Sequence, residues 1–378
     1  MSSLIYLDNA ATTPLAPEVL ATMQSALERL YGNPSSSHSL GIDASSSLVR
    51  SRKAIAGFLD CRPEEVVFTG GGSEADNLAL FGTAYASRKR SIVVSAIEHP
   101  AVLEAANELA ARGWNVSVVP VDRQGMVDAA ALVDSVGPDT ALVSVMAANN
   151  EIGTVQPVKD LARAVKRKAP EALFHTDAVQ YFGKVPLSLA DGVLDLVSIA
   201  AHKIHGPKGV GALYARKGVR IRPLVFGGGQ EAGQRSGTEN VAGIAGFAKA
   251  AELMFSALET DSCHLSALVA AIRQALEAGI PGLLVNGHPE SRLPNVLSVS
   301  LAGLKSQNLV NFLDDEGVIV SAGSACHSTR TRRSHVVEAI GLPPEYATMR
   351  ISPSRYTRMA DAMEAAARIV RVVEKLRS

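Results

Sequence analysis

Short apolar runs rich in β-branched residues recur along the chain from about residue 64. Several are separated by stretches with the residue spacing of helices, such as 74–88, 100–112 and 157–168. Alternating strands and helices predict a mostly parallel α/β sheet with helices on both faces. Ligands of such sheets bind at the carboxyl ends of the strands. The runs are VVFT (66–69), SIVVS (91–95), VSVV (116–119), ALVSVM (141–146), LFHTD (173–177), LDLVSIA (194–200) and GVGALYA (209–215).

The pattern changes in the last third of the chain, where residues 238–280 read as long helices rich in Ala and Leu. Shorter apolar runs and single helices follow, which favours a smaller α+β unit. At 378 residues the chain exceeds one ordinary compact unit. We therefore predict a large domain over 15–260 and a small domain made of 1–14 and 261–378. The later segments are NVLSVSLAG (295–303), a helix near 305–315, GVIVSAGSA (317–325), TMRISPS (348–354) and a helix over 358–376.

The last predicted helix carries apolar residues at alternating spacings of four and three, which indicates one buried stripe. The stripe consists of Met359, Met363, Ala366, Val370 and Val373.

Composition narrows the class of protein. Lys and Arg number 37 and Asp and Glu also 37, so no overall basic field favours nucleic acid. No apolar run is long enough to cross a membrane, and the first residues lack the pattern of a secretory signal. Three widely spaced cysteines, Cys61, Cys263 and Cys326, do not predict a disulfide framework. We expect a cytoplasmic protein with no membrane association and no direct binding of nucleic acid.

The segment SIAAHKIHGPKGVGALY (198–214) carries the first candidate for chemistry, because a predicted strand ends in His202 and Lys203 before a glycine-rich turn. A buried lysine can form a Schiff base with an aldehyde cofactor. A surface lysine beside a turn is the alternative interpretation of this segment alone.

Three other strand ends offer complementary groups. The turn FTGGGSEADNLAL (68–80) precedes a helix, an arrangement that binds anions. Asp177 in HTDAVQ can pair with a pyridine nitrogen, and His99 in IEHPAV can stack on a flat ring or move protons. Each residue alone more often has a structural role, but together the four segments predict a pyridoxal-phosphate (PLP) site.

Cys326 is the candidate nucleophile. It lies in GVIVSAGSACHSTRTRRSHVV, where small residues precede it and His327, Arg330, Arg332 and Arg333 follow. Positive neighbours stabilise a thiolate, and the small and polar residues favour a mobile loop. An inert cysteine at a strand end is the alternative. Cys61 and Cys263 carry no motif, and no cysteine and histidine cluster has the spacing of a metal site.

The chain resembles the cysteine desulfurases of the NifS/IscS type, which are class V aminotransferases with PLP fold type I. The similarity runs nearly end to end. It rests on YLDNAATTP (6–14), GNPSSSH (32–38), the glycine turn (70–77), EHPAV (98–102), NNEIGTVQP (149–157), HTDAVQ (175–180), HKIHGPKG (202–209), RSGTEN (235–240), PNVLSVS (294–300) and SAGSAC (321–326).

The resemblance implies a role for each matching residue. Lys203 forms the Schiff base with PLP, and Cys326 receives the substrate sulfur as a persulfide. Thr238 reaches the phosphate of the neighbouring subunit, which implies a homodimer, and Arg350 binds the substrate carboxylate. Either Lys203 or His99 removes the substrate proton. The remaining cofactor contacts are Asp177 at the pyridine nitrogen, Gln180 at the ring hydroxyl, His99 stacked on the ring, Asn150 near the ring, and Gly72, Ser73 and His202 at the phosphate.

The chain departs from the family pattern at two positions. The family usually has a serine phosphate donor where this chain has Ala200, so one phosphate hydrogen bond is expected to be missing. Ser73 stands where threonine is commoner. The basic residues after Cys326 suggest the further hypothesis that Arg330, Arg332 and Arg333 recognise an acidic patch on a sulfur acceptor.

The expected reaction converts L-cysteine to L-alanine and passes sulfur from Cys326 to an acceptor protein. A selenocysteine lyase and a desulfurase dedicated to DNA phosphorothioation are alternatives that share the chemistry. A scaffold without turnover is a further alternative: Ala200 favours it, and the presence of Lys203, Asp177, His99 and Cys326 together argues against it. The sequence does not predict the acceptor, which could serve iron–sulfur cluster assembly, tRNA thiolation, cofactor synthesis or DNA modification.

Overall fold

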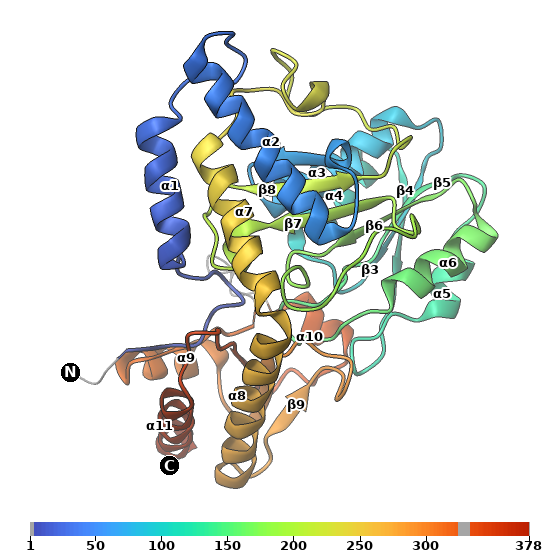
Figure 1. The fold of residues 1–378 in the computed structure, drawn as a ribbon. Coiled ribbons are helices and arrows are strands. Elements are labelled where there is room, and N and C mark those ends of the chain that lie inside the picture. The colour runs from blue at the N-terminus through green and yellow to red at the C-terminus, as the bar shows by residue number, and fades with distance from the viewer. Residues whose placement is uncertain (1–3, 324–332, 378) are drawn as a thin grey trace.

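A seven-stranded sheet forms the centre of the larger part of the molecule (Figure 1). The structure is a computed structural model that describes residues 4–323 and 333–377. Strand β8 is antiparallel to both of its neighbours, and the other adjacent pairs are parallel. The predicted mostly parallel sheet is confirmed, and the predicted strand ends lie within two residues of those observed. In spatial order the strands are β2 (Val66–Thr69), β8 (Gly211–Ala215), β7 (Leu196–Ala200), β6 (Leu173–Asp177), β5 (Thr140–Ser144), β3 (Ser91–Ser95) and β4 (Asn115–Val119).

Helices cover both faces of this sheet, which explains why its inner strands are buried on both faces rather than on alternate residues. Every residue of β3, β5 and β7 is buried, whereas the edge strand β4 is partly exposed. Helices α3 (Gly72–Ala86) and α4 (Pro100–Ala111) cover one face. The other face is covered by α2 (Ser39–Leu59), α5 (Ala129–Asp134), α6 (Val158–Lys168) and α7 (Val241–Ser256), with α1 (Pro17–Arg29) packed outside α7.

A second hydrophobic core lies below the sheet in Figure 1 and joins the two ends of the chain. Leu7 near the N-terminus packs with Leu268, Leu297 and Met349, and all four side chains are fully buried. Strand β1 (Ile5–Tyr6) pairs in parallel with β11 (Val318–Ile319). The other elements of this part are β9 (Leu284–Asn286), β10 (Leu297–Ala302), β12 (Tyr346–Ile351), α8 (Leu258–Gly279), α9 (Ser306–Asp315), α10 (His335–Ala339) and α11 (Met359–Arg377). The domain boundaries stay a prediction.

The apolar stripe predicted for α11 is wrong at its beginning. Met359 and Met363 are each 42% exposed, whereas Ala362, Ala365 and Ile369 are fully buried. Helix α11 packs against α8, and Ala362, Ala365 and Ile369 belong to the second hydrophobic core. The buried face of α11 therefore begins with alanine and not with the more apolar methionines.

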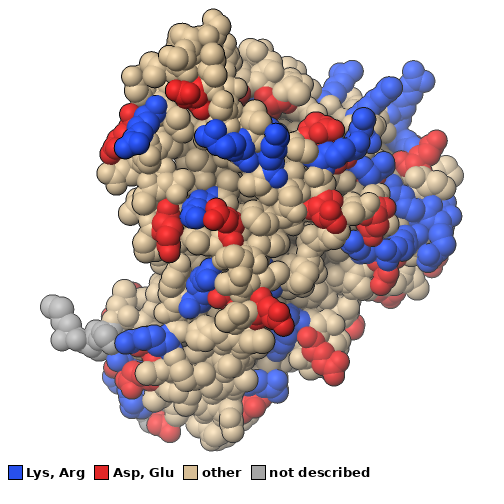
Figure 2. All heavy atoms as spheres, in the orientation of Figure 1, with Lys and Arg blue, Asp and Glu red and all other residues tan. Residues whose placement is uncertain are grey.

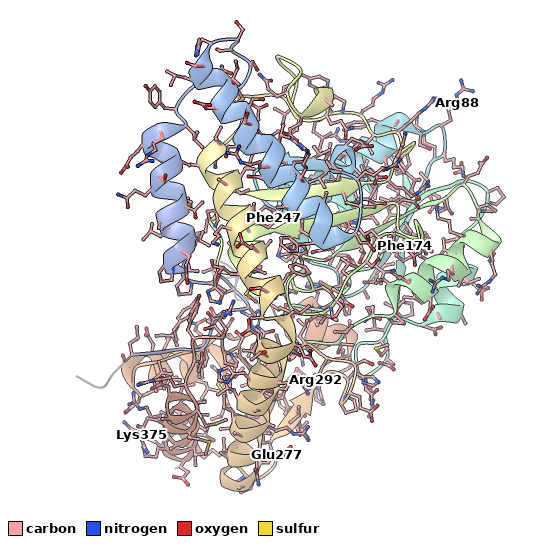
Figure 3. All side chains as sticks on the ribbon, in the orientation of Figure 1. Arg88, Phe174, Phe247, Glu277, Arg292 and Lys375 are labelled. Atoms are coloured by element: carbon pink, nitrogen blue, oxygen red, sulfur yellow. The ribbon has the colours of Figure 1, made fainter. Side chains whose placement is uncertain are left out.

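Side chains in the two parts follow the same division between core and surface. Phe174 on β6 and Phe247 on α7 point into the core between sheet and helices, whereas Glu277 and Lys375 lie on outer helix surfaces (Figure 3). Among the described residues no single helix meets the length and apolar content of a membrane span; α7 and α8 do so only as a pair bent by 75°.

Basic side chains gather at the end of the molecule that contains α6, with acidic side chains among them (Figure 2). On α6, Lys159 and Arg163 both reach Asp191, at 3.0 Å and 3.2 Å. Lys166 pairs with the buried carboxylate of Asp195 at 2.5 Å. These ion pairs neutralise much of the positive charge of the helix.

Candidate active site

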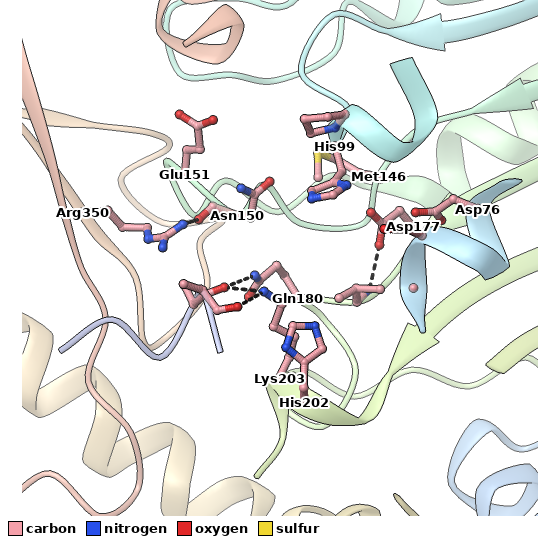
Figure 4. A pocket seen from close by; sticks show the side chains of 16 residues that line it. Asp76, His99, Met146, Asn150, Glu151, Asp177, Gln180, His202, Lys203 and Arg350 are labelled. Carbon is pink, nitrogen blue, oxygen red and sulfur yellow. Dashed lines mark hydrogen bonds between the residues drawn. The ribbon is translucent and has the colours of Figure 1, made fainter. Parts of the chain in front are cut away.

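Nine of the eleven predicted site residues line one cavity of about 270 Å³ at the carboxyl ends of the sheet strands. Arg350 and Asn150 lie at one end of the cavity, and Asp177 and Asp76 lie at the other (Figure 4). The predicted residues in the lining are Gly72, Ser73, His99, Asn150, Asp177, Gln180, His202, Lys203 and Arg350.

Lys203 lies in a short 3₁₀ turn, Ala201–Lys203, that follows β7 directly. Its Nζ donates hydrogen bonds to the carbonyl oxygens of Ala10 at 2.8 Å and Ala11 at 2.6 Å. The Gln180 amide also donates to the Ala10 carbonyl, at 2.8 Å. The N-terminal segment, held by the second core, therefore forms part of the wall around the candidate Schiff-base lysine.

Asp177 is the last residue of β6 and is 5% exposed. Its Oδ1 accepts the Val179 backbone N–H at 2.9 Å, which fixes the carboxylate. Burial raises the pKa of Asp177, while the Val179 hydrogen bond and the Lys203 charge oppose that rise. A cationic pyridinium in the cavity would compensate the buried negative charge.

Behind Asp177 lies a second buried carboxyl, Asp76 on α3, which the sequence analysis did not single out. Burial and the nearby Asp177 raise the pKa of Asp76 well above its ordinary range. The Nε2 atom of His175 lies 3.6 Å from Asp76 Oδ1 and 3.0 Å from Ser198 Oγ. Burial lowers the pKa of His175 to about 3, so this ring is neutral and its proton is placed by its neighbours.

A buried polar chain extends from His175 across the sheet. Its Nδ1 lies 2.8 Å from Ser144 Oγ, which is 3.5 Å from Glu98 Oε2. Glu98 is fully buried and accepts hydrogen bonds from the Met146 N–H at 2.7 Å and the Ser95 hydroxyl at 2.5 Å. Burial raises the pKa of Glu98 to about 8. The chain supports the cavity floor with groups that are mostly uncharged at neutral pH.

His99 begins α4 and caps it: its Nδ1 accepts the Ala101 backbone N–H at 3.1 Å. Because Nδ1 is the acceptor, the proton of the neutral ring is on Nε2. Pro100 at the first helical position suits this start, since proline lacks the N–H that would need a partner. The helix start therefore fixes both the tautomer and the orientation of His99 beside the cavity.

The start of α3 forms the anion-binding end. Gly71 has a φ of 152°, and α3 begins at Gly72, so backbone N–H groups and the helix dipole face the cavity lined by Gly72 and Ser73. A Cβ atom on Gly72 would lie 2.7 Å from Val179 Cγ2, so this position requires glycine. The same built Cβ would lie 3.6 Å from the Cβ of the fully buried Ala200. A serine hydroxyl at 200 would thus adjoin this end of the cavity.

His202 lies at the same end and is partly buried. Its Nδ1 is 3.2 Å from Thr12 Oγ1. Burial and the charges of Lys203 and Lys208 lower the pKa of His202 to about 3. His202 therefore offers a neutral N–H donor rather than a positive charge.

Arg350 on β12 is 1% exposed and is held by both parts of the chain. Nη2 donates to Asp8 Oδ1 at 2.7 Å, and Nη1 donates to the Asn150 carbonyl at 2.8 Å. Its buried Nε has no hydrogen-bond partner among residues 4–323 and 333–377. An orphaned buried donor beside a cavity is suited to an incoming carboxylate.

Among the predicted residues that the structure describes, only Thr238 does not line the cavity. Thr238 is exposed and borders a separate hollow with Gly70 and Arg235. Cys326 lies outside the described residues, as do His327, Arg330 and Arg332.

Both described ends of the segment that contains Cys326 are tied to the cavity. The Gly323 carbonyl accepts from Arg350 Nη1 at 3.4 Å. On the other side, the Ser334 hydroxyl donates to Oε2 of Glu151, a cavity residue, at 2.6 Å. Glu151 was not predicted as a site residue, although it directly follows Asn150 in the NNEIGTVQP motif.

The hypothesis that Arg333 recognises an acidic acceptor is not supported by its contacts. Its Nη2 donates to the carbonyl oxygens of Leu342 and Pro343, the latter at 2.8 Å. The guanidinium thus closes the turn after α10 with main-chain acceptors. A basic residue near a nucleophile is not distinguishable in sequence from one that fixes a loop.

Asp76, His99 and Asp177 each offer one ligand atom within 4.8 Å of the others, an arrangement that can hold a metal ion. Sequence spacing did not indicate this group because its members come from three separate elements. These three residues line the cavity together with Lys203 and the start of α3. The arrangement therefore also suits a flat cationic ring that lies between the Asp177 carboxylate and the His99 imidazole. The expectation that no metal binds stays a prediction.

Comparison with known proteins agrees with this arrangement. Residues 5–364 match the family model described as Aminotransferase class-V. A cysteine desulfurase IscS of Dictyoglomus turgidum is 41% identical over 382 residues, covering 100% of this chain and 96% of that relative.

Two solved structures are also similar. One described as a NifS-like protein has a TM-score of 0.93 at 40% identity and covers 98% of this chain and 100% of its own. A structure described as SspA in complex with cysteine has a TM-score of 0.80 at 32% identity and covers 93% of this chain and 99% of its own. The family resemblance read from the motifs is confirmed: the chain belongs to the class-V aminotransferase family.

Proposed function

We propose that this protein is a PLP-dependent cysteine desulfurase that converts L-cysteine to L-alanine and takes the sulfur as a persulfide on Cys326. The observation that carries the proposal is the meeting of Lys203, Asp177 and His99 with the start of α3 around one cavity. Full-length relatives that are named cysteine desulfurases support the same activity.

The described residues fit PLP at both of its ends. The start of α3, Ser73 and His202 provide uncharged N–H and O–H donors for a phosphate. The buried carboxylate of Asp177 would hold the pyridinium nitrogen of the ring. Gly72 leaves the space that a Cβ atom would fill. When bound, PLP would supply an aldehyde carbon and an electron sink for charge developed at the substrate's α-carbon.

The protein groups would then hold the substrate and move its protons. Arg350 would bind the substrate carboxylate through Nε and one Nη, since Nε has no described partner. The Lys203 amine, fixed by the Ala10 and Ala11 carbonyls, would accept the α-proton. His99 would exchange a proton only through Nε2, because Nδ1 caps α4.

Cys326 is within reach of this cavity along the chain. It is three residues from Gly323, whose carbonyl contacts the Arg350 guanidinium. An extended chain spans at most about 3.6 Å per residue, so about 11 Å separates the two positions at most. We propose that the Cys326 thiolate attacks the substrate sulfur and breaks its bond to the substrate β-carbon. The electron pair of that bond stays on the substrate carbon skeleton, which takes up a proton to give alanine. Cys326 then holds the sulfur as a persulfide and passes it to an acceptor protein.

We propose that the active unit is a homodimer, with Thr238 of each subunit completing the phosphate site of the other. Phe226 is 81% exposed, and exposed apolar residues also lie on α1 and α2. Such a surface is typical of protein interfaces. The residues on the two helices are Leu20, Leu27, Leu40, Ile42 and Val49. Phe226→Asp is expected to give monomers in light scattering; a dimer of unchanged stability would contradict this interface.

Iron–sulfur cluster assembly is one pathway that the persulfide could supply. The proposed compartment is the cytoplasm, where the exposed Cys263 thiol would stay reduced.

The test of the proposed function is alanine and sulfide release from cysteine with a thiol reductant, in the wild type and in Cys326→Ala. Equal amounts of both products from the wild type and none from the variant are expected. If PLP is bound and neither protein reacts with cysteine, the desulfurase proposal fails. Faster turnover of selenocysteine than of cysteine would instead favour a selenocysteine lyase.

A further inference from the structure

Lys184 is a buried lysine that no step of the proposed reaction uses. It follows β6 in a turn and is only 6% exposed. In the described part of the chain no carboxylate lies within 4.0 Å of its Nζ, which donates a 2.9 Å hydrogen bond to Gln180 Oε1. Burial, together with the charges of Lys203 and Arg350, lowers the pKa of Lys184 to about 7. A buried amine without a counter-ion is unfavourable, so its retention calls for a physical reason.

The contact with Gln180 is one link of a chain that ends at the candidate Schiff-base lysine. Gln180 accepts from Lys184 through Oε1 and donates through Nε2 to the Ala10 carbonyl at 2.8 Å. The same carbonyl accepts from Lys203 Nζ at 2.8 Å. Gln180 lines the active-site cavity (Figure 4), whereas Lys184 borders a separate hollow and contacts the cavity wall through Gln180.

This chain selects one of the two orientations of the Gln180 amide. A side-chain amide can rotate by half a turn, which exchanges its oxygen and its nitrogen. In the rotated form the amide N–H groups would face the Lys184 donor, and the amide oxygen would face the Ala10 carbonyl. The contact between the two oxygens would be repulsive, and so would the contact of the N–H groups with the protonated Lys184 amine. With Lys184 present, Gln180 therefore keeps its NH₂ group on the side of Ala10 and the cavity.

An NH₂ group has two hydrogens, and the Ala10 carbonyl takes one. The second is available to an acceptor in the cavity, such as the phenolic oxygen of PLP. We propose that Lys184 is a positioning residue that holds the Gln180 amide in the orientation that donates to this oxygen. The inference rests on the proposed function and adds a residue that acts on the cofactor only through Gln180.

The test replaces Lys184 by methionine, which has a similar shape and no donor. PLP binding is measured by equilibrium titration, and the visible absorption of the bound cofactor is titrated against pH. Loss of one hydrogen bond to a charged oxygen corresponds to roughly a tenfold rise in the PLP dissociation constant. The pKa read from the absorption is expected to rise, because the phenolic oxygen loses a donor. Lys208→Met removes an exposed positive charge near His202 with no bond to Gln180, and it is expected to change neither value.

A double-mutant cycle with Gln180→Ala separates action through Gln180 from a through-space effect of the charge. If Lys184 acts through Gln180, Lys184→Met has no further effect on either reading in the Gln180→Ala background. Equal effects in both backgrounds, or no effect in the wild type, would overturn the inference. So would a Lys184→Met protein that does not fold, because a lysine retained only to orient an amide is dispensable to the fold. PLP binding and PLP absorption are both measured without cysteine. Wild-type protein that binds PLP but releases no sulfide would therefore refute the proposed function and leave the role of Lys184 untouched.

Discussion

Arg350 and Asp8, which are 342 positions apart in sequence, form an ion pair of 2.7 Å beside the candidate active site. The pair fixes one edge of the guanidinium and leaves Nε without a described partner. An arginine held in this way can grip a carboxylate with little loss of conformational freedom. The pair thus explains how a substrate contact is prepared before the substrate arrives.

Arg350→Lys is expected to lower kcat/KM for cysteine by about 10- to 100-fold, mainly through KM. A lysine keeps the charge but cannot form the forked pair, and a hydrogen bond to a charged group contributes about 1.5–3 kcal/mol. Steady-state kinetics measure the effect, with PLP absorption as a check of cofactor loading. Arg355→Lys, at an ion pair with Asp261, is the matched control. An unchanged KM for cysteine in Arg350→Lys would show that the substrate carboxylate binds elsewhere.

Glu98→Gln is expected to raise thermal stability more at pH 8 than at pH 5. In the folded protein the pKa of Glu98 is about 8, above its ordinary value of 4.5. Between these values the unfolded chain releases its proton first, so the wild type loses stability as pH rises through this window, and the glutamine variant does not. Differential scanning fluorimetry at several pH values measures the difference. Glu108→Gln on the exposed side of α4 should show no such trend; a constant offset for Glu98→Gln would contradict the raised pKa.

Gly72→Ala is expected to weaken PLP binding by about tenfold or more, because the new Cβ would lie 2.7 Å from Val179 Cγ2 at the start of α3. Equilibrium titration with PLP measures the loss. Gly57→Ala in α2 is the control, since no atom lies within 4 Å of its built Cβ. That change should leave PLP affinity unaltered and add about 0.5–1 kcal/mol of stability. Equal PLP affinity in Gly72→Ala would exclude the start of α3 as the phosphate site.

Ala200→Ser is expected to tighten PLP binding by about tenfold, because it restores a hydroxyl beside the start of α3. Without the cofactor the same change should lower the melting temperature, since a hydroxyl is then buried at a fully enclosed position. The two opposite effects distinguish a phosphate donor from a general change in stability. Ala212→Ser on the neighbouring strand should show only the destabilisation. Unchanged affinity in Ala200→Ser would mean that other donors already satisfy the phosphate.

The strands and most of the candidate site could be predicted because both follow local rules. Strands such as β3 and β7 are short apolar runs, and Asp177 and Lys203 come at or just after the ends of strands. Parallel strands bring such ends to one edge of the sheet, so separate motifs converge there. The convergence of nine predicted residues on one cavity follows from this geometry.

Relationships between distant parts of the chain could not be predicted in the same way. No pattern around Lys184 or Glu98 indicates that a charged residue there is buried. The interaction of Arg333 with main-chain carbonyls depends on the path of the turn after α10. The stripe on α11 was misplaced because Ala362 packs closely in a way that hydropathy alone undervalues.

The contacts between distant parts of the chain determine when during synthesis the active-site wall can form. Ala10, whose carbonyl accepts from Lys203, is itself held by the Ser352 hydroxyl at 2.9 Å, and β1 pairs with β11. During synthesis residues 5–10 must therefore wait until residues 318–352 have left the ribosome. The cavity wall closes only then, so the cofactor can be loaded only after these later residues have been made, although the first half of the wall has long been present.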